Sequence, residues 1–280
     1  MKKLMAFLLS LTMLVALGAG FTSCSPRVED WADIQEKGEF VCGITLYEPM
    51  NYFPDPTNRD MSTLTGFDTE LARLVAAKLG VEVKFQVIEW GLKYMELQSG
   101  TIDCIWNGFT SNSKDDDGIE RKDKVDFTYA YLDNAQCVVV KKSELASFTS
   151  AAALKDLVGV AEDGSAGETY AKSVSEKTVI GVGAQMDAFA EIKAGAAQFA
   201  VVDVLLAEKT VGVGDFSDLA IVETISIDKE VYSIGCRKGS DFDEKINEAL
   251  VALLNEGKIE ELAAKYNVRV TDSLLAMKSK

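Results

Sequence analysis

The stretch that decides the fold is SGTIDCIWNGFT, residues 99–110. Its apolar part, residues 102–106, consists of β-compatible residues between Ser-Gly and Asn-Gly, which predicts a short buried strand. The preceding elements are strand patterns at 39–45 and 81–88 and helix patterns at 65–79 and 90–99. This βαβαβ order indicates an open α/β sheet. Because ligands bind beyond the carboxyl ends of strands in such sheets, we expect residues 107–110 to hold a small molecule.

The loop after this strand carries groups that suit both ends of an α-amino acid. The carbonyl of Gly108 and the hydroxyl of Thr110 can accept hydrogen bonds from an ammonium group. Downstream, Arg121 offers a planar guanidinium, which matches a carboxylate with two parallel hydrogen bonds. The residues alone therefore favour a zwitterionic ligand at this edge of the sheet.

The helix predicted at residues 65–79 has its own start and stop signals. Thr65 and Asp68 have the spacing of a capping box, and Gly80 follows the last apolar position. Between them, apolar residues recur at the helical period. We therefore expect the side chains of Thr65 and Asp68 to cap the first turn of this helix.

The second half of the chain repeats the α/β pattern. Strand patterns occur at 136–141, 158–161, 178–182, 198–204 and 232–239, and helix patterns at 187–194, 241–256 and 258–266. The strand at 198–204 carries Asp203 close to its carboxyl end. A chain of this length is natural for two hydrophobic cores. Two α/β units, each with a loop at its strand ends, predict a ligand cleft between them.

The amino terminus has the features of an export signal. Residues 1–23 contain two lysines, then an apolar run, then small residues before Cys24, and the run is too short for a permanent membrane span. Residues 21–24, FTSC, resemble a bacterial lipobox, which implies a lipidated Cys24 that anchors the exported protein to the membrane surface. The alternative is an ordinary cleavage site followed by a free cysteine. Residues 24–30 are predicted to form the tether.

Composition excludes several classes of function. The chain has 29 basic and 44 acidic residues, a net charge of −15, which argues against nucleic acid as a partner. It has no histidine, so Ser-His-Asp catalysis and histidine-based zinc sites are excluded. The remaining cysteines stand singly in apolar runs: Cys42, Cys104, Cys137 and Cys236. We expect them to be small buried hydrophobic residues and expect no metal or cofactor, although disulfides stay open.

The motifs of the central stretch resemble a known family. LQSGTID at 97–103, Gly108-Phe109-Thr110, Glu120-Arg121 and Asp126-Phe127 are similar, in this order, to the polar amino acid-binding proteins of ABC importers, bacterial solute-binding protein family 3. The resemblance covers about residues 31–267. It implies a two-lobe periplasmic-binding-protein-like (Venus flytrap) fold of the α/β class. Lobe 1 would comprise residues 31–135 and 233–280, and lobe 2 residues 136–232.

The resemblance also implies roles for individual residues. The expected ligand-binding residues are Tyr47, Trp90, Asn107, Gly108, Thr110, Arg121, Gly164, Ser165, Ala166 and Asp203. Tyr47 and Trp90 would line the ligand side chain. Arg121 and the amides of residues 164–166 would bind the carboxylate. Asp203, with Gly108 and Thr110, would bind the ammonium group.

The chain departs from the family pattern before Arg121. Residues 111–120 form a longer connection than the family has at this point. If this insertion bulges outward, Arg121 keeps its place, and otherwise Lys114 supplies the positive charge. Glu162 is expected to face the cleft near the ligand side chain.

These features predict an exported solute-binding protein and not an enzyme. We expect a monomer that captures a free polar or cationic amino acid and delivers it to an ABC permease and its ATPase. Two alternatives remain: a surface sensor or adhesin, and a dehydratase-like enzyme with Glu162 and Glu168 as cleft acids.

Overall fold

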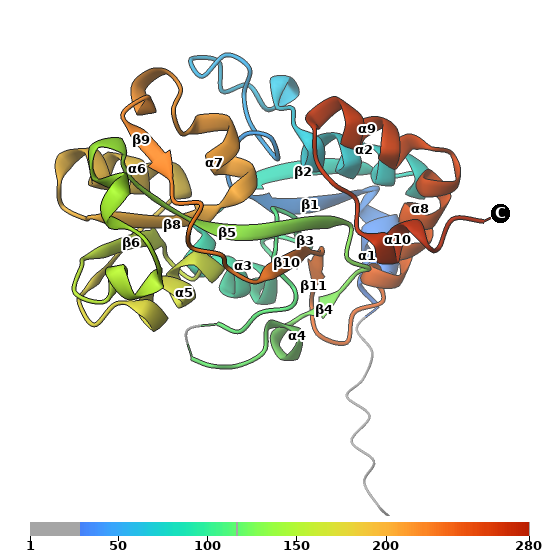
Figure 1. Ribbon diagram of the computed structural model, residues 1–280. Helices are drawn as coiled ribbons and strands as arrows, with labels where there is room; N and C mark the ends of the chain where they lie inside the picture. Colours follow the sequence, from blue (N-terminus) through green and yellow to red (C-terminus); the bar gives the residue numbers. More distant parts are fainter. Residues whose placement is uncertain (1–28, 116, 280) are drawn as a thin grey trace, which may run out of the picture.

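The structure, a computed structural model, describes residues 29–115 and 117–279. The predicted signal segment and Cys24 lie outside the described residues. The described chain forms two β-sheets with helices packed around each, and the sheets lie side by side as two lobes (Figure 1). In the described part of the chain, we find no helix that is both long enough and apolar enough to cross a membrane.

The first sheet contains the predicted central strand. Its strand order is β2 (Glu82–Val87), β1 (Glu39–Ile44), β3 (Cys104–Ile105), β11 (Gly235–Cys236) and β4 (Asp126–Phe127). β1 pairs in parallel with β2 and β3, whereas β11 runs antiparallel to both of its neighbours. The βαβαβ prediction is therefore confirmed, and the sheet is completed by a strand from the far end of the chain.

The helices of the first lobe are α1 (Asp30–Lys37), α2 (Phe67–Leu79), α3 (Lys93–Ser99), α4 (Arg121–Lys124), α8 (Phe242–Asn255), α9 (Lys258–Tyr266) and α10 (Asp272–Leu275), with 3₁₀ turns at Met61–Thr63 and Trp90–Leu92. Of these, α2, α3, α8 and α9 lie in the predicted segments, whereas α4 and α10 were not predicted. In α2, Leu71, Ala72 and Val75 are buried at helical spacing against the sheet and α8. Burial of each large apolar side chain contributes about 1.5–3 kcal/mol to stability.

The second sheet is built from the middle of the chain. Its strand order is β10 (Lys229–Tyr232), β5 (Leu132–Lys141), β8 (Phe199–Asp203), β6 (Gly159–Glu162) and β7 (Val179–Val182), with β9 (Leu219–Ile221) also paired to β5. The surrounding helices are α5 (Ala166–Val174), α6 (Gln185–Ala194) and α7 (Val204–Thr210), with 3₁₀ turns at Lys142–Ser147, Ala151–Leu154 and Gly214–Phe216. Sequence patterns located most of these elements but missed α7, β9 and β10.

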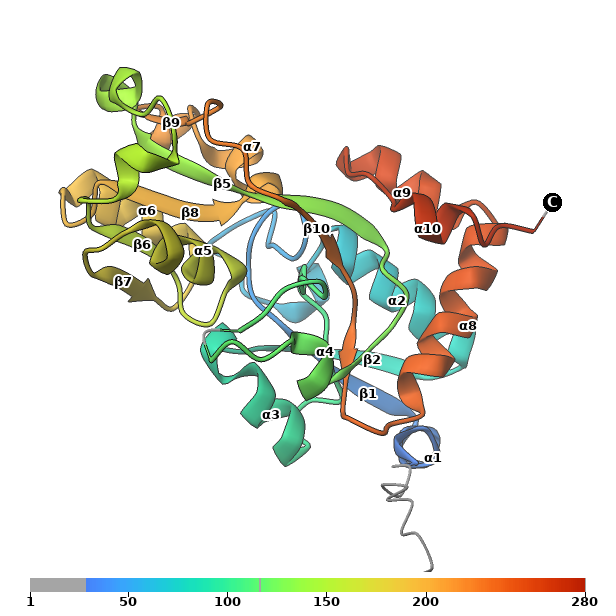
Figure 2. The same cartoon turned by 60° about the horizontal axis from the view of Figure 1, so that its bottom comes forward.

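The chain passes between the lobes at two adjacent places. β5 and β10 pair antiparallel, with Leu132 opposite Tyr232, and both continue toward the first sheet (Figure 2). The preceding strand of the first sheet ends at Phe127, and the following one begins at Gly235. Because only two neighbouring connections join the lobes, this paired ribbon is where a change in lobe angle requires the least rearrangement.

The predicted capping box of α2 is wrong. Gly66 is the N-cap residue and makes no side-chain cap, and Thr65 donates a hydrogen bond to Glu70 instead. Asp68 turns inward, where its Oδ2 accepts from the amide of Gly108 at 3.0 Å and its Oδ1 from the hydroxyl of Tyr131 at 2.8 Å. The first amides of α2 need no side-chain cap, because they donate to the backbone carbonyls of Pro49 and Met50. Without Asp68, in contrast, the buried amide of Gly108 would lose its hydrogen bond.

The prediction of buried cysteines is confirmed. Cys42, Cys104, Cys137 and Cys236 are buried free thiols within the part of the chain that the structure describes. Three of them occupy one row across the first sheet, because Cys104 is the register partner of both Cys42 and Cys236.

Candidate ligand-binding site

A small cavity lies where the carboxyl ends of strands from both lobes meet. Its lining residues are Trp90, Asn107, Gly108, Thr110, Arg121, Gln136, Glu162, Ser165, Ala166, Gln185 and Asp203. Its free volume is only about 10 Å³, so side chains of the two lobes nearly fill it, and a ligand would enter only with the lobes farther apart. The cavity lining contains eight of the ten residues expected from sequence.

The other two expected residues lie beside the cavity rather than in its lining. Tyr47 is buried beneath Gly108, where a Cβ atom on Gly108 would lie 2.2 Å from the Tyr47 hydroxyl. Gly164 contributes its carbonyl to the lobe interface, as described below. Asn107 lines the cavity, but its side chain bonds Asn51 and Thr45 and so supports the loop from behind.

Arg121 is the basic residue of the cavity lining. It is 1% exposed, and its Nε donates to Asp115 at 2.9 Å. Its Nη1 and Nη2 donate to the carbonyls of Thr110 and Gly164, both at 3.2 Å. Lys114, in contrast, has a 57% exposed side chain and pairs with Glu120 at 3.5 Å. The insertion therefore leaves the guanidinium in the cleft and adds Asp115 as its buried counter-ion.

Asp203 forms the acidic end of the cavity. Its Oδ1 accepts hydrogen bonds from Asn134 at 2.8 Å and Gln136 at 2.5 Å, and its Oδ2 accepts from Gln185 at 2.6 Å. Burial raises the pKa of this carboxyl against the effect of these amides. Sequence reasoning missed Gln136 and Gln185, because glutamine is usually a surface residue and nothing in the local sequence indicates that these two bind a buried acid.

Glu230 on β10 is a further acid that sequence reasoning missed. Its Oε2 accepts from the hydroxyl of Thr110 at 3.0 Å and from Gln136 at 2.9 Å. Burial, and then the charge of Asp203, raise its pKa to about 7. The segment around Glu230 carries several charges, which is typical of a solvent-exposed segment. No local sequence pattern therefore predicted that Glu230 contacts Thr110.

Glu162 ends β6 and is 2% exposed. Its Oε1 has no hydrogen-bond partner among the described residues. Burial, followed by the nearby charge of Asp203, raises its pKa to about 8. The sequence-based expectation that Glu162 faces the cleft agrees with its place in the cavity lining.

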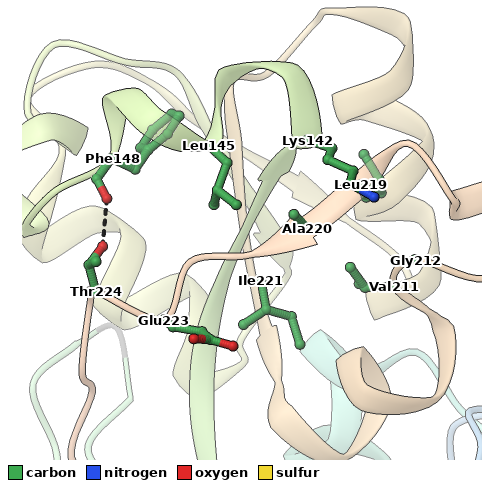
Figure 3. A pocket seen from close by; sticks show the side chains of 10 residues that line it. All are labelled: Lys142, Leu145, Phe148, Val211, Gly212, Leu219, Ala220, Ile221, Glu223 and Thr224. Atoms are coloured by element: carbon green, nitrogen blue, oxygen red, sulfur yellow. Dashed lines mark hydrogen bonds between the residues drawn. The ribbon is translucent and has the colours of Figure 1, made fainter.

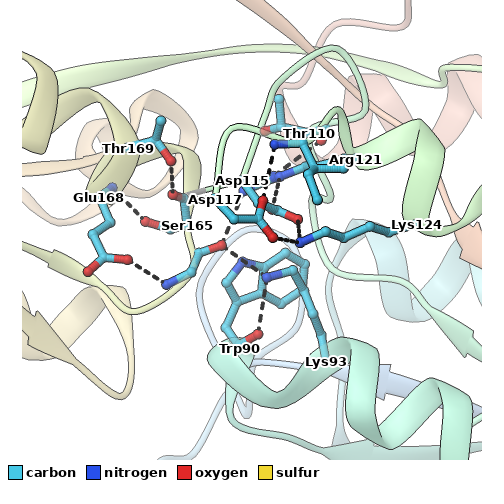
Figure 4. Close-up of polar contacts among 12 residues, drawn as sticks. Trp90, Lys93, Thr110, Asp115, Asp117, Arg121, Lys124, Ser165, Glu168 and Thr169 are labelled. Carbon is cyan, nitrogen blue, oxygen red and sulfur yellow. Dashed lines mark hydrogen bonds and ion pairs between the residues drawn. The ribbon is translucent and has the colours of Figure 1, made fainter.

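Lys93 connects the two lobes at the edge of the cavity (Figure 4). Its ammonium donates to the carbonyl of Gly164 in the second lobe at 3.0 Å and to that of Trp90 at 3.3 Å. It lies 4.8 Å from the ring centroids of both Trp90 and Tyr94. Desolvation by burial and the neighbouring Arg121 charge lower its pKa to about 7. The carbonyl of Gly164 therefore receives a cationic donor from both Lys93 and Arg121.

The amino end of α5 faces the cavity through Ser165 and Ala166. Ser165 is the N-cap, and its hydroxyl accepts from the amide of Glu168 at 3.0 Å. Glu168 in turn accepts from the amide of Gly164 at 2.8 Å, and both contacts are drawn in Figure 4. A helix amino terminus attracts anions, since its free amides and its dipole both favour negative charge. It lies on the same side of the cavity as the carbonyl of Gly164 and thus near Arg121.

A larger hollow in the second lobe has different properties (Figure 3). Its apolar lining comes mainly from Leu145, Phe148, Leu219 and Ile221. The polar side chains that line it, Lys142, Glu223 and Thr224, are exposed. Because these lining residues present no buried charge to a ligand, we place the site at the cleft between the lobes.

Comparisons with known proteins agree with this arrangement. The model of the bacterial extracellular solute-binding proteins, family 3, matches residues 41–269. The arginine-binding extracellular protein ArtP of Bacillus subtilis is 26% identical over 82% of this chain and 86% of its own. A structure of an ancestral arginine-binding protein bound to arginine is 31% identical, covers 82% of this chain and 98% of its own, and has a TM-score of 0.72.

A third similar protein is a substrate-binding protein of an ABC uptake transporter from Streptococcus pneumoniae, solved with bound histidine. It is 28% identical, with a TM-score of 0.72 over 85% of this chain and 96% of its own. The family match spans more than half of the chain and includes both lobes and the cleft residues. This chain therefore belongs to the bacterial extracellular solute-binding proteins of family 3.

Proposed function

We propose that this protein captures a free α-amino acid between its lobes and delivers it to an ABC importer. The observation that carries the proposal is that Arg121 and Asp203 line the same small cavity, where they offer a positive and a negative group to one ligand. Arg121 and the amino end of α5 would bind the α-carboxylate. Asp203 would bind the α-ammonium group together with the carbonyl of Gly108 and the hydroxyl of Thr110, which keeps free lone pairs while it donates to Glu230.

Closure of the lobes would couple binding to transport. We assign residues 31–135 and 233–280 to the first lobe and 136–232 to the second, with the β5–β10 ribbon as the hinge. A ligand stabilises the closed state only through contacts that it makes better there than in the open state. Here those contacts would come from Asp203 and the start of α5, which join a ligand first held by the first lobe.

The remaining parts of the proposal concern location and partners. The family is exported, and a lipidated Cys24 would hold this protein at the membrane surface beside its permease and ATPase. The protein would act as a monomer without catalysis. Of the two acids that a cleft enzyme would use, Glu168 already caps Gly164 and pairs with Lys172 at 2.7 Å, which supports a binding role.

Thermal unfolding of the domain that begins at residue 25, measured with a panel of free amino acids, tests the proposal. A ligand at 100 times its Kd adds about 2.7 kcal/mol, which corresponds to about 5–10 °C in a domain of this size. We expect Arg121→Ala and Asp203→Ala to abolish the shift and Lys114→Ala to preserve it. If no amino acid raises the unfolding temperature, the proposed function is wrong.

A further inference from the structure

We propose that Glu162 binds a positively charged group on the ligand side chain, so that the amino acid captured here is a basic one. This inference rests on the proposed function and adds the chemical class of the ligand. It assigns the recognition of the side chain to the second lobe.

The first observation is the unsatisfied carboxylate. Glu162 is 2% exposed, lines the cavity, and keeps one oxygen without a partner among the described residues. A buried polar atom without a hydrogen bond costs about 1–3 kcal/mol, and more if it is charged. Natural proteins rarely retain such an atom without a use, so its partner is expected to arrive with the ligand.

The second observation is the charge balance of the cavity. Arg121 is compensated by Asp115 at 2.9 Å. Among the described residues, no cation lies within ion-pair distance of Asp203, Glu230 or Glu162, and the first two receive side-chain hydrogen bonds from uncharged groups. The α-ammonium group of a ligand compensates one acid at the Asp203 end. At Glu162, whose pKa of about 8 leaves the carboxyl mostly protonated near pH 7 in the empty cavity, a cation on the ligand side chain would take the place of this proton.

Lys93 is the protein cation whose charge acts on Glu162 most directly. Its ammonium is already used by the carbonyls of Trp90 and Gly164 and by two aromatic rings. It makes no ion pair with Glu162 within the described chain. Asp203 and Asp163 add negative charge around Glu162, which attracts a ligand cation and, without a ligand, favours a proton on the Glu162 carboxyl.

Glu162 enters the cavity from a different strand than Asp203. It ends β6, the strand next to β8, which carries Asp203. Trp90 lines the same cavity from the first lobe. An aliphatic stem could therefore pack on Trp90 while its terminal ammonium or guanidinium reaches Glu162, as in L-ornithine, L-lysine or L-arginine.

Calorimetric titration with matched ligands tests this inference. L-Arginine and L-citrulline have nearly the same shape, but only arginine carries a side-chain charge. We expect the wild-type domain to bind at least one of arginine, lysine and ornithine about 100-fold more tightly than citrulline. Glu162→Gln, which keeps the size and removes the charge, should lose most of this preference while citrulline affinity changes little.

Two further variants separate the possible outcomes. Asp163→Asn removes a neighbouring exposed charge and should alter affinity less than about threefold, because exposed charges are screened. Asp203→Asn should abolish the binding of charged and neutral ligands alike. One outcome overturns the inference but upholds the proposed function. In it, the protein binds amino acids and Asp203→Asn abolishes this binding, but basic side chains are not preferred, or the preference for them survives Glu162→Gln. Absence of any amino acid binding overturns both.

Discussion

The Nε atom of Arg121 donates a hydrogen bond to the Oδ1 atom of Asp115 at 2.9 Å, and both side chains are buried. Asp115 belongs to the inserted segment 111–120, so the insertion supports the cleft arginine instead of replacing it. With Nε held in this way, the two Nη atoms point to the carbonyls of Thr110 and Gly164 at the cavity edge. The insertion thus determines the orientation of the group that we expect to bind the ligand carboxylate.

Removal of Asp115 should destabilise the fold. Asp115→Ala leaves the guanidinium of Arg121 buried without its counter-ion, which costs about 3–5 kcal/mol for a buried pair. Urea unfolding of the ligand-free domain measures the loss. Lys114→Ala in the same loop is the matched control, because its exposed pair with Glu120 contributes at most about 1 kcal/mol. Equal effects of the two variants would contradict a buried pair at Arg121.

A side chain at Gly108 should disrupt the ligand loop. Gly108 has φ = 57°, and an added Cβ would lie 2.2 Å from the Tyr47 hydroxyl. We expect Gly108→Ala to combine about 1–2 kcal/mol of left-handed backbone strain with about 1–3 kcal/mol of steric overlap, and to weaken ligand binding.

The control for this substitution is Gly100→Ala. Gly100 has φ = 76° but no atom within 4 Å of an added Cβ, so only the backbone strain applies. The difference in unfolding free energy between the two variants isolates the overlap at Gly108. Tyr47→Phe in the Gly108→Ala background should recover part of that difference. If the two alanine variants are equally stable, the close contact with Tyr47 is not real.

The stability of the ligand-free protein should fall between pH 5 and pH 7. Burial raises the pKa of Asp68 to about 7, and burial also raises that of Glu230 to about 7. The folded state then holds protons that the unfolded state releases near pH 4, so unfolding becomes easier as pH rises toward 7. For Asp68 alone the shift of about three units corresponds to at most about 4 kcal/mol.

Above pH 7 this trend should flatten, because a rise caused by Lys93 opposes the fall that Glu162, with a pKa of about 8, continues up to pH 8. Desolvation lowers the pKa of Lys93 to about 7, so the folded state releases a proton that the unfolded state keeps, and stability rises with pH. Chemical unfolding at pH 5, 7 and 8.5 measures the unfolding free energy on both sides of pH 7. Asp68→Asn should reduce the fall in this free energy between pH 5 and pH 7, and Lys93→Met should reduce the rise above pH 7. Asp117→Asn, which removes an exposed acid, should change neither. If the fall in unfolding free energy between pH 5 and pH 7 is the same in Asp68→Asn, Asp68 is ionised in the folded protein.

The four cysteines of the domain that begins at residue 25 should be protected thiols. Cys42, Cys104 and Cys236 share one row of the first sheet, and burial raises the pKa of the Cys104 and Cys236 thiols. Since the thiolate is the reactive form, we expect no reaction with a maleimide reagent in the folded state. After unfolding without reductant, all four thiols should react. A count of two would instead show a disulfide.

Local sequence determined the parts of the protein that depend on neighbouring residues. The strand at 102–106, the following loop and the acid at the end of the strand at 198–204 were predictable, because periodicity and turn residues act over short distances. The motifs in their order determined the two-lobe family. Eight of ten expected site residues consequently lie in one cavity.

Only the tertiary structure decided the partners of the buried polar groups. Thr110 bonds Glu230 across 120 residues of sequence, and Gln185 bonds Asp203 from a different element. Asp68 was assigned to a helix cap from its spacing, yet it supports Gly108 from the core. A buried polar atom takes the partner that packing brings within about 3 Å, and spacing along the chain does not encode that distance. That one oxygen of Glu162 has no hydrogen-bond partner among the described residues follows only from the tertiary structure, and the proposed class of ligand depends on this observation.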